Sequence, residues 1–285
     1  MTRNLSDVID YFLPAKPPEP LTTKSSFDHD ALADRLKSER ATPPRSKTQK
    51  TKKSLRLLPI LALPIGDRDV VRAAFAWNLA VEIARMGGRA KILTPELNPP
   101  SPLWPEPGMG PLGTELIPVR ASNLDSLYRV ALDSAFVRSS EEGQNGGIIF
   151  VRVPPAWLLK PGDGAPLLRW SLLFSTPRPP DLKEACGVSK TIFRVQPNAD
   201  VGITIHGAQG RREAEGAFDQ LSSATQEEIG HNLRSHGLLV DDLHVYRAIV
   251  AQRPIGLAYP QAPAARALRD IARILMEEAE GLRLG

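Results

Sequence analysis

From residue 57 onward, short apolar runs alternate with longer amphipathic stretches, and this alternation constrains the fold more than any other feature of the sequence. The apolar runs predict buried strands, and the amphipathic stretches predict helices. The expected strands are 57–63, 90–93, 115–119, 147–153, 170–175 and 201–206. The expected helices span about 69–86, 123–137, 181–194, 211–236 and 262–280. This order predicts a three-layer α/β domain with a mainly parallel central sheet.

One segment of this domain is unusually rich in proline. Eight prolines fall between residues 95 and 118. Because proline breaks helices and lacks a backbone N–H, this segment is expected to be a long, stiff surface loop.

Residues 1–54 are expected to form a separate, flexible arm in front of an α/β domain at 55–285. The arm holds 11 basic and 7 acidic side chains, whereas the remainder is neutral, with 36 − 11 = 25 basic and 32 − 7 = 25 acidic. Six basic and no acidic residues lie between 40 and 53, among Ser, Thr and Pro, which predicts a solvated linker. Contact of this run with nucleic acid is disfavoured, because aromatic residues are not interleaved; contact with an anionic or acidic partner stays an alternative.

A short amphipathic helix is predicted at about 5–13, near the tip of the arm. Its apolar residues recur at helical spacing and form one stripe. These residues are Leu5, Val8, Ile9 and Phe12. Such a stripe could pack on its own domain, belong to a disordered tail, or bind the groove of a protein partner. The last is the functional hypothesis.

The expected location is cytoplasmic. The single cysteine, Cys186, cannot form an internal disulfide, and the N-terminus lacks the apolar run of a signal peptide. The longest apolar run, 57–65, is interrupted by two prolines and is too short to span a membrane. The acidic end of the chain argues against membrane insertion as well.

Metal and acid–base chemistry are not expected. His231 and His236 are five residues apart, so they do not share a helix face, and both are interpreted as solvated or capping residues. The pair Asp241 and Asp242 is interpreted as structural. No metal and no cofactor is therefore predicted.

The turn after the first strand, at 63–74, is where an α/β protein would bind phosphate. A phosphate-binding P-loop needs several glycines, a lysine and a Ser or Thr hydroxyl. Here Gly66 is the one glycine, Asp67 and Asp69 would repel phosphate, and no hydroxyl is present.

Three segments resemble the MinD/ParA family of deviant P-loop ATPases. The sequence NLAVEIARMGGRAKIL at 78–93 is similar to the first helix and second strand of the family. The sequence STPRPPDLKEA at 175–185 resembles a later strand end and helix, and 237–265 resembles the C-terminal third of the FlhG-like branch. The resemblance covers about 56–280 and implies a P-loop-NTPase-like fold.

The family's nucleotide-binding residues do not match. The resemblance places its two lysines on Asp67 and Arg72, its last loop glycine on Val71 and its magnesium-binding hydroxyl on Ala73. The metal-proximal acid falls on Arg152. Losing these groups together leaves little to stabilise a transferring phosphoryl group, which predicts a non-catalytic pseudo-ATPase without a bound cofactor.

The resemblance therefore implies a cytosolic scaffold or regulator that binds protein partners through the arm and the α/β domain. Placement of a flagellar, pilus or secretion machine is the process that the family suggests. The alternatives are an active positioning ATPase with an unconventional phosphate site, built from Arg68, Arg72 and Arg152, or a ParA-like DNA-binding protein. A homodimer is left open, because family dimers form around ATP.

Overall fold

The computed structural model describes residues 55–96, 101–138 and 146–284. The chain divides into two units, residues 1–52 and 53–285, and the described residues all belong to the second. The helix predicted at 5–13 lies outside the described residues, as do the linker at 40–53 and the four residues of its apolar stripe, Leu5, Val8, Ile9 and Phe12.

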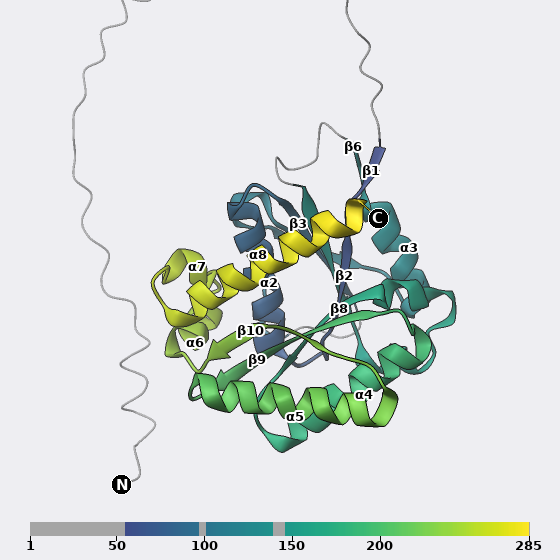
Figure 1. Ribbon diagram of the computed structural model, residues 1–285. Coiled ribbons are helices and arrows are strands. Elements are labelled where there is room, and N and C mark those ends of the chain that lie inside the picture. Colours follow the sequence, from purple (N-terminus) through teal and green to yellow (C-terminus); the bar gives the residue numbers. More distant parts are fainter. Residues whose placement is uncertain (1–54, 97–100, 139–145, 285) are drawn as a thin grey trace, which may run out of the picture. The chain divides into compact units, whose positions relative to one another are not determined.

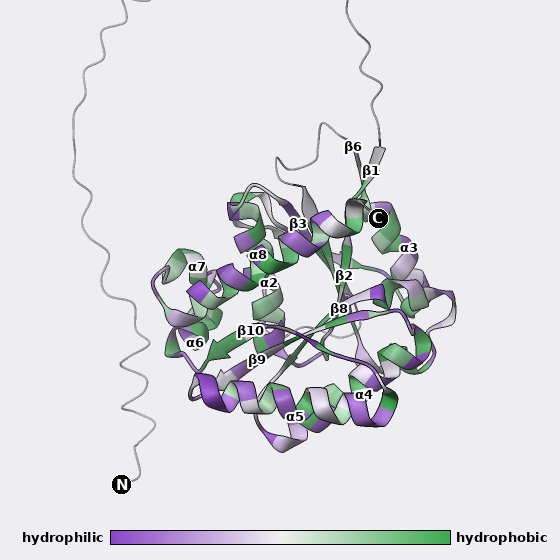
Figure 2. Cartoon of the chain, in the orientation of Figure 1, coloured by the Kyte–Doolittle hydropathy of each residue, from purple (hydrophilic) through white to green (hydrophobic). Residues whose placement is uncertain are grey.

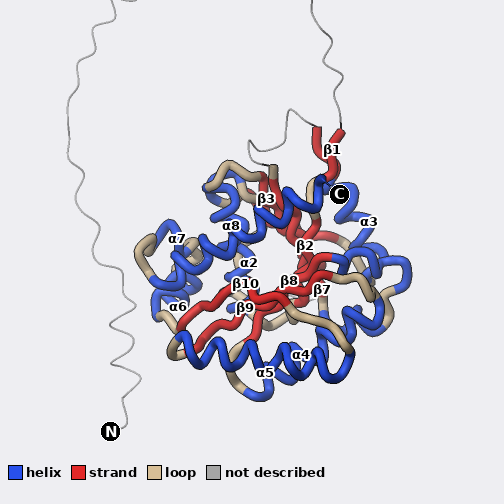
Figure 3. The backbone as a smooth tube through the Cα atoms, in the orientation of Figure 1, coloured by secondary structure: helices blue, strands red, loops and turns tan. Residues whose placement is uncertain are grey.

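The second unit is built around an eight-stranded sheet, which runs through the middle of the molecule (Figures 1 and 3). Its strands are β2 (Ile60–Pro64), β3 (Arg89–Pro95), β4 (Gly108–Met109), β5 (Glu115–Val119), β7 (Gly147–Val153), β8 (Trp170–Ser175), β9 (Asp200–Ala208) and β10 (Arg234–Val240). The order across the sheet is β10-β9-β8-β2-β7-β3-β5-β4. All neighbouring strands are parallel except β4 and β5. The predicted α/β class with a mainly parallel sheet is confirmed.

Helices cover both faces of this sheet. They are α2 (Val70–Arg85), α3 (Leu124–Ala135), α4 (Pro179–Val195), α5 (Arg211–Ile229), α6 (Leu243–Val250), α7 (Ile255–Ala258) and α8 (Pro263–Leu284). Short 3₁₀ helices are η1 (Pro111–Gly113), η2 (Pro155–Leu159) and η3 (Gly162–Arg169). Within the described residues, no helix has the length and apolar character needed to cross a bilayer.

Two apolar cores lie on opposite faces of the sheet, which makes the architecture three-layered. One core packs α2, α6, α7 and α8 against the sheet, and the other packs α3, α4 and α5. The helices are mixed in hydropathy along their lengths (Figure 2). This pattern is that of helices with one buried stripe.

The bounds predicted for the first strand, 57–63, are wrong. Residues 55–57 form a separate strand, β1 (Leu55–Leu57), which pairs antiparallel with β6 (Phe136–Arg138) outside the main sheet. The central strand begins only at Ile60, after Pro59, whose lack of an N–H interrupts strand pairing. From there β2 pairs with β7 along its whole length, from Ile60 with Ile149 to Pro64 with Val153.

Two predicted helices are too long. The helix expected at 211–236 ends at Ile229, because Gly230 adopts a left-handed conformation with φ 70° and terminates it. Residues 234–240 then form β10, a strand that the sequence prediction missed. The helix expected at 123–137 ends at Ala135, and the next residues enter β6.

The proline-rich segment contains no α-helix in its described part, as predicted, but it is not wholly a surface loop. Trp104 and Pro105 are buried, and β4 adds an edge strand to the sheet. The indole of Trp104 anchors the loop over the end of the sheet, next to the turn that follows β2.

Candidate functional site

The β2–α2 turn lies at the carboxyl edge of the sheet. Because β2 pairs in parallel with both β7 and β8, the turn lies between the carboxyl ends of these two neighbouring strands. In open parallel sheets this position is where ligands bind. The residues predicted from sequence as degenerate phosphate-loop positions all belong to this turn and the start of α2.

The N-terminus of α2 is capped by its own chain. Asp69 is the N-cap residue, and its Oδ1 accepts a hydrogen bond from the backbone N–H of Arg72 at 2.9 Å. A helix N-terminus attracts anions through its free N–H groups and its dipole. Here a carboxylate of the protein itself takes that place.

Arg72 is also held by carboxylates of the chain. Its Nε lies 3.0 Å from Asp69 Oδ2, and its Nη2 lies 3.1 Å from Oε2 of Glu184 on α4. The side chain of Arg72 is 12% exposed. Arg72, which the family resemblance places at the position of the phosphate-loop lysine, therefore links α2 to α4.

Arg152 points from the end of β7 into the β2–α2 turn. Its Nε donates to the carbonyl of Ile65 at 3.2 Å, and its Nη1 donates to Oγ1 of Thr94 at 3.1 Å. Its Nη2 is paired with Asp67. The guanidinium also lies over the ring of Trp104, 5.0 Å from the ring centroid. All three nitrogens of the group are thus engaged.

In the Arg152–Asp67 pair, the arginine side chain is buried and the aspartate side chain is partly exposed. The side chain of Arg152 is 8% exposed, and that of Asp67 is 34% exposed. Burial lowers the pKa of Arg152, while the charge of Asp67 and its hydrogen bond oppose that shift. A buried guanidinium of this kind requires its counter-ion, because an unpaired buried charge is costly.

The remaining predicted positions supply no polar group to the turn. Ala73 is buried in the core beneath α2, and Val71 packs against the same core. Gly66 has no neighbouring atom within 4 Å of the position where a Cβ would stand. Between Ala73, Trp104 and Arg152 lies a cavity of only about 10 Å³, the space of a single water.

Three contributors to this arrangement were missed from sequence. Trp104 was assigned to a surface loop, although a large aromatic residue among prolines is a sign of a buried anchor. Glu184 lies 112 residues from Arg72, and the sequence carries no local signal of that pairing. Asp69 was noted only as a repulsive charge, whereas its position before an apolar helical run also fits an N-cap.

A second polar group lies at the ends of β8 and β9. Burial works to raise the pKa of Asp181, but hydrogen bonds from Thr176 and Arg178 outweigh it, so this pKa lies below its ordinary value. Burial, together with the charges of Arg72 and Arg178, lowers the pKa of His206 to about 4 despite the nearby Asp181. The ring of His206 is therefore neutral at pH 7 and packs edge-on against Phe75.

His231, His236 and Asp242 make contacts that are structural. His236 was expected to be solvated or capping, but it is buried, and its Nε2 lies 2.9 Å from Oε2 of Glu278. His231 stacks on Phe193 with ring centroids 4.3 Å apart. Asp242 caps α6 and accepts from the N–H groups of His244 and Ala264, as a structural residue does. Among the described residues, no group of three or more His, Cys, Asp or Glu side chains could hold a metal ion.

Comparison with known proteins gives fold relatives but no sequence relative. No protein-family model and no curated protein matches the sequence. The structure is similar to the MinD cell division protein of Aquifex aeolicus, with 14% identity, a TM-score of 0.54, and coverage of 77% of this chain and 97% of that one. It is also similar to a ParA family ATPase from Chlorobium tepidum TLS, with 12% identity, a TM-score of 0.56, and coverage of 76% and 98%.

A third similar structure is the MinC:MinD cell division protein complex of Aquifex aeolicus, with 12% identity, a TM-score of 0.55, and coverage of 77% of this chain and 96% of that one. At these identities the likeness is one of fold. The unit that follows residue 52 has the three-layer fold of the MinD and ParA ATPases, with a cation–carboxylate pair at the turn where that fold would bind phosphate.

Proposed function

We propose that this protein is a non-catalytic, MinD/ParA-type pseudo-ATPase that acts by binding protein partners. The single observation that carries the proposal is the Arg152–Asp67 pair in the β2–α2 turn. Asp67 places a negative charge where the phosphates of a nucleotide would lie, and Asp69 already caps the helix that would receive them. Anion binding there would have to displace both carboxylates against their own cationic partners.

The alternative of an unconventional phosphate site needs cations that are free to receive phosphate. Of its three candidate arginines, Arg72 and Arg152 are engaged by carboxylates of the chain, and Arg68 alone is exposed. One exposed arginine is a weak basis for phosphoryl transfer, which requires several preorganised positive groups or a metal ion. This comparison favours the non-catalytic proposal.

The decisive experiment is equilibrium binding of a fluorescent ATP analogue to the full chain, with and without Mg²⁺. We expect no saturable binding below millimolar concentration and no phosphate release above the protein-free rate. Magnesium-dependent binding at micromolar concentration or tighter would overturn the proposal. An Asp67→Lys, Arg152→Asp double variant serves as the comparison, because it exchanges the signs of the two charges of the pair.

The proposed partners are proteins. One similar structure is a complex of MinD with MinC, so the fold is able to present a protein-binding surface. Within this chain, we assign one partner contact to Leu5, Val8, Ile9 and Phe12. Replacing Ile9 and Phe12 with Asp should abolish partner capture and leave the thermal midpoint of the core unchanged; a drop of many degrees would show that these residues belong to the fold instead.

The proposed setting is the cytosol, where the partners would belong to a positioned machine such as a flagellum, a pilus or a secretion system. A DNA-binding role is the competing proposal. It requires affinity for duplex DNA that falls steeply with salt and is lost when the basic residues of 40–53 are neutralised. Absence of both effects supports the protein-binding role.

A further inference from the structure

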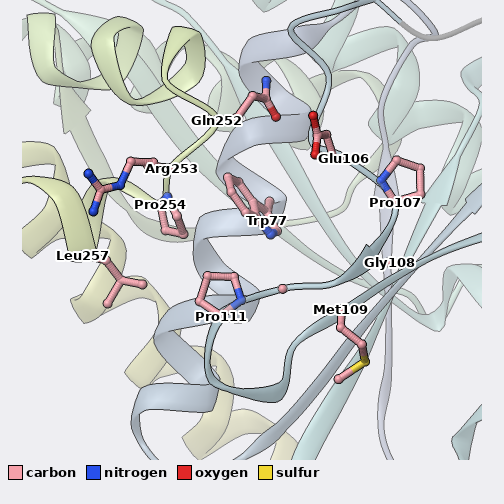
Figure 4. A pocket seen from close by; sticks show the side chains of 11 residues that line it. Trp77, Glu106, Pro107, Gly108, Met109, Pro111, Gln252, Arg253, Pro254 and Leu257 are labelled. Carbon is pink, nitrogen blue, oxygen red and sulfur yellow. The ribbon is translucent and has the colours of Figure 1, made fainter. Parts of the chain in front are cut away.

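A hollow of about 350 Å³ opens near the β4 edge of the sheet. Three segments line it: the middle of α2 at Trp77, the stretch around β4 from Glu106 to Pro111, and the connection from Gln252 to Leu257 (Figure 4). None of its lining residues belongs to the β2–α2 turn. The hollow is thus separate from the site discussed above.

The side chain of Trp77 forms the floor of the hollow, in the centre of the view in Figure 4. The indole is partly exposed, and its N–H donates no hydrogen bond within the part of the chain that the structure describes. Gly110 lies beside this donor: a Cβ there would stand 3.5 Å from Trp77 Nε1, although its nearest neighbour would be Oγ1 of Thr114 at 2.6 Å. An aromatic face beside a free donor is suited to an apolar group that adjoins a carbonyl oxygen.

The rim adds one charge of each sign and a row of apolar side chains. Glu106 and Arg253 are both exposed, and neither makes an ion pair with any described residue. Met109 is 73% exposed and Leu257 is 41% exposed. Exposed apolar groups beside unpaired charges are typical of surfaces that bind another protein chain.

The backbone of β4, the outermost strand of the sheet within the described residues, offers further hydrogen bonds. Gly110 donates to the carbonyl of Thr114 at 2.8 Å, and Met109 is the next residue along the antiparallel pair with β5. Because peptide groups alternate in direction along such a pair, the N–H and C=O of Met109 face away from β5. An edge strand with outward peptide groups can pair with an added strand.

One residue with a strained backbone lines the hollow, and a second lies next to a lining residue. Leu112 and Gln252, with φ angles of 59° and 49°, are the two non-glycine residues with positive φ among those that the structure describes. Gln252 lines the hollow, and Leu112 lies in η1 directly after the lining residue Pro111. Such conformations cost free energy and concentrate at functional sites.

We propose that this hollow binds an extended peptide segment of a partner protein. An apolar side chain of the segment packs on Trp77, a carbonyl of its backbone accepts from Trp77 Nε1, and its main chain pairs with Met109. A basic residue of the segment faces Glu106, and an acidic residue faces Arg253. This inference rests on the proposed protein-binding role and supplies a surface for it on the α/β unit.

The exposure of the walls argues for a peptide rather than a small molecule. A small-molecule site encloses most of its ligand, whereas Glu106, Met109 and Arg253 stand open to solvent. The N–H and C=O of Met109 that face away from β5 can form main-chain hydrogen bonds with a peptide. Binding of a small molecule alone would therefore count against the proposal.

The test is selection from a phage-displayed library of linear 12-residue peptides on the full chain, followed by titration of the enriched synthetic peptides. We expect a consensus with one apolar anchor, a basic residue on one side of it and an acidic residue on the other. In the ¹H–¹⁵N spectrum, the indole resonance assigned by Trp77→Phe should shift on binding. Trp77→Phe should weaken binding about fivefold, because the donor is lost while the aromatic face remains.

Two further variants test the specificity and the edge pairing. Selection on Glu106→Lys should yield an acidic residue where the wild-type consensus is basic. Met109→Pro removes an N–H that faces away from β5, so it should weaken binding about tenfold and leave the fold intact. Leu159→Ala, which alters a 74% exposed apolar residue in η2, is the matched control and should change nothing.

The proposal is overturned if no consensus emerges, or if enriched peptides bind Trp77→Phe, Glu106→Lys and Met109→Pro as tightly as the wild type. Should Trp77→Phe fail to fold, the exposed Glu106→Lys decides the matter. Titrating the same peptides with and without Mg-ATP separates the two proposals. Peptide binding together with tight nucleotide binding would overturn the pseudo-ATPase role and leave the peptide-binding proposal standing. Absence of both peptide binding and nucleotide binding would overturn the peptide-binding proposal and leave the pseudo-ATPase role standing.

Discussion

Arg152 and Asp67 show how two side chains can define the chemistry of a turn. The guanidinium is almost fully buried and meets the carboxylate, a backbone carbonyl, a threonine hydroxyl and an indole ring. Two of these partners lie in the β2–α2 turn, the threonine lies in β3, and Arg152 itself belongs to β7, so the contacts fix the turn against β3 and β7. Removing Asp67 leaves the buried guanidinium without its counter-ion in a low-dielectric setting.

We therefore predict strong coupling between these two positions. Asp67→Asn and Arg152→Met should each lower the free energy of unfolding, and the double variant should lose less than the sum of the two. A coupling energy of about 1–3 kcal/mol is expected for charges in direct contact. Urea unfolding of the wild type and the three variants measures it. Additive single effects would show that the ion pair contributes nothing beyond its separate groups.

His206 leads to a prediction of pH dependence. Its folded-state pKa of about 4 lies below the ordinary 6.5, so the unfolded chain binds the proton first as pH falls. Stability is then fully present above pH 6.5 and declines toward pH 4, by roughly 3 kcal/mol for a shift of this size. His206→Phe removes the titrating group and keeps an aromatic ring against Phe75.

Urea unfolding at pH 7.5, 5.5 and 4.5 tests this prediction. The variant should lose clearly less stability than the wild type between the first and last pH. Asp242 and Glu278, whose pKa values lie below their ordinary range, also weaken the fold in acid, but they do so in both proteins. Parallel pH curves would refute the assignment to His206.

Among the secondary-structure elements, β9 and β10 meet through an irregular register. Ser235 pairs with Ile203 and Gly237 pairs with Thr204, so His236 is the extra residue of a bulge. Its ring covers Gly202 of β9 and binds Glu278 of α8. One bulge thus joins two strands and the last helix.

Gly202→Ala should be strongly destabilising for this reason. A Cβ there would stand 2.2 Å from Nδ1 of His236, a ring that is buried and held by Glu278. Overpacking of this kind costs about 3 kcal/mol or more. Gly216→Ala is the matched control, because an exposed glycine in α5 with no atom within 4 Å should gain about 0.5–1 kcal/mol from the same change. Equal effects on the unfolding free energy would contradict this interpretation of the bulge.

The elements that could be predicted from sequence are those with an uninterrupted pattern. β5, β7 and β8 have the predicted bounds, because their apolar runs are short and are flanked by turn residues; β7 and β8 are also buried along their whole length. β10 was missed, because only Gly230 marks the end of the preceding helix and the strand itself is half polar, with the sequence RSHGLLV. Its place in the sheet depends on β9 and α8, contacts that local periodicity does not encode.

The candidate site was predictable in its composition but not in its contacts. Counting along the chain from the segments that carry the family resemblance was enough to single out Asp67, Arg72 and Arg152. That Asp67 pairs with Arg152, and Arg72 with Glu184, depends on how β2, β7 and α4 assemble. The hollow at Trp77 combines three segments, so no single stretch of sequence indicates it.

At the scale of the whole molecule, the described part of the second unit holds two apolar cores. Among the described residues, these cores extend from Leu58 to Ala279. We therefore expect this unit to fold by burial within 53–285, which holds the eight-stranded sheet and the helices on both of its faces.

We expect a chain that begins at Lys53 to unfold in a single transition with the same thermal midpoint as the full chain. Differential scanning calorimetry of the two proteins provides the comparison. A midpoint lowered by more than about 4 °C, which corresponds to roughly 1–2 kcal/mol for a domain of this size, would mean that residues 1–52 contribute to the fold.

The Arg152–Asp67 pair also has an evolutionary consequence. Because the buried guanidinium of Arg152 requires its counter-ion, a mutation at Asp67 exposes the chain to selection for a compensating change at Arg152. Among homologues with this turn, residues 67 and 152 should covary as a pair: acid with arginine, or both replaced together. Under the proposed pseudo-ATPase role, a lineage that regained nucleotide binding would have to pass through a destabilised single mutant, which would make the proposed loss hard to reverse.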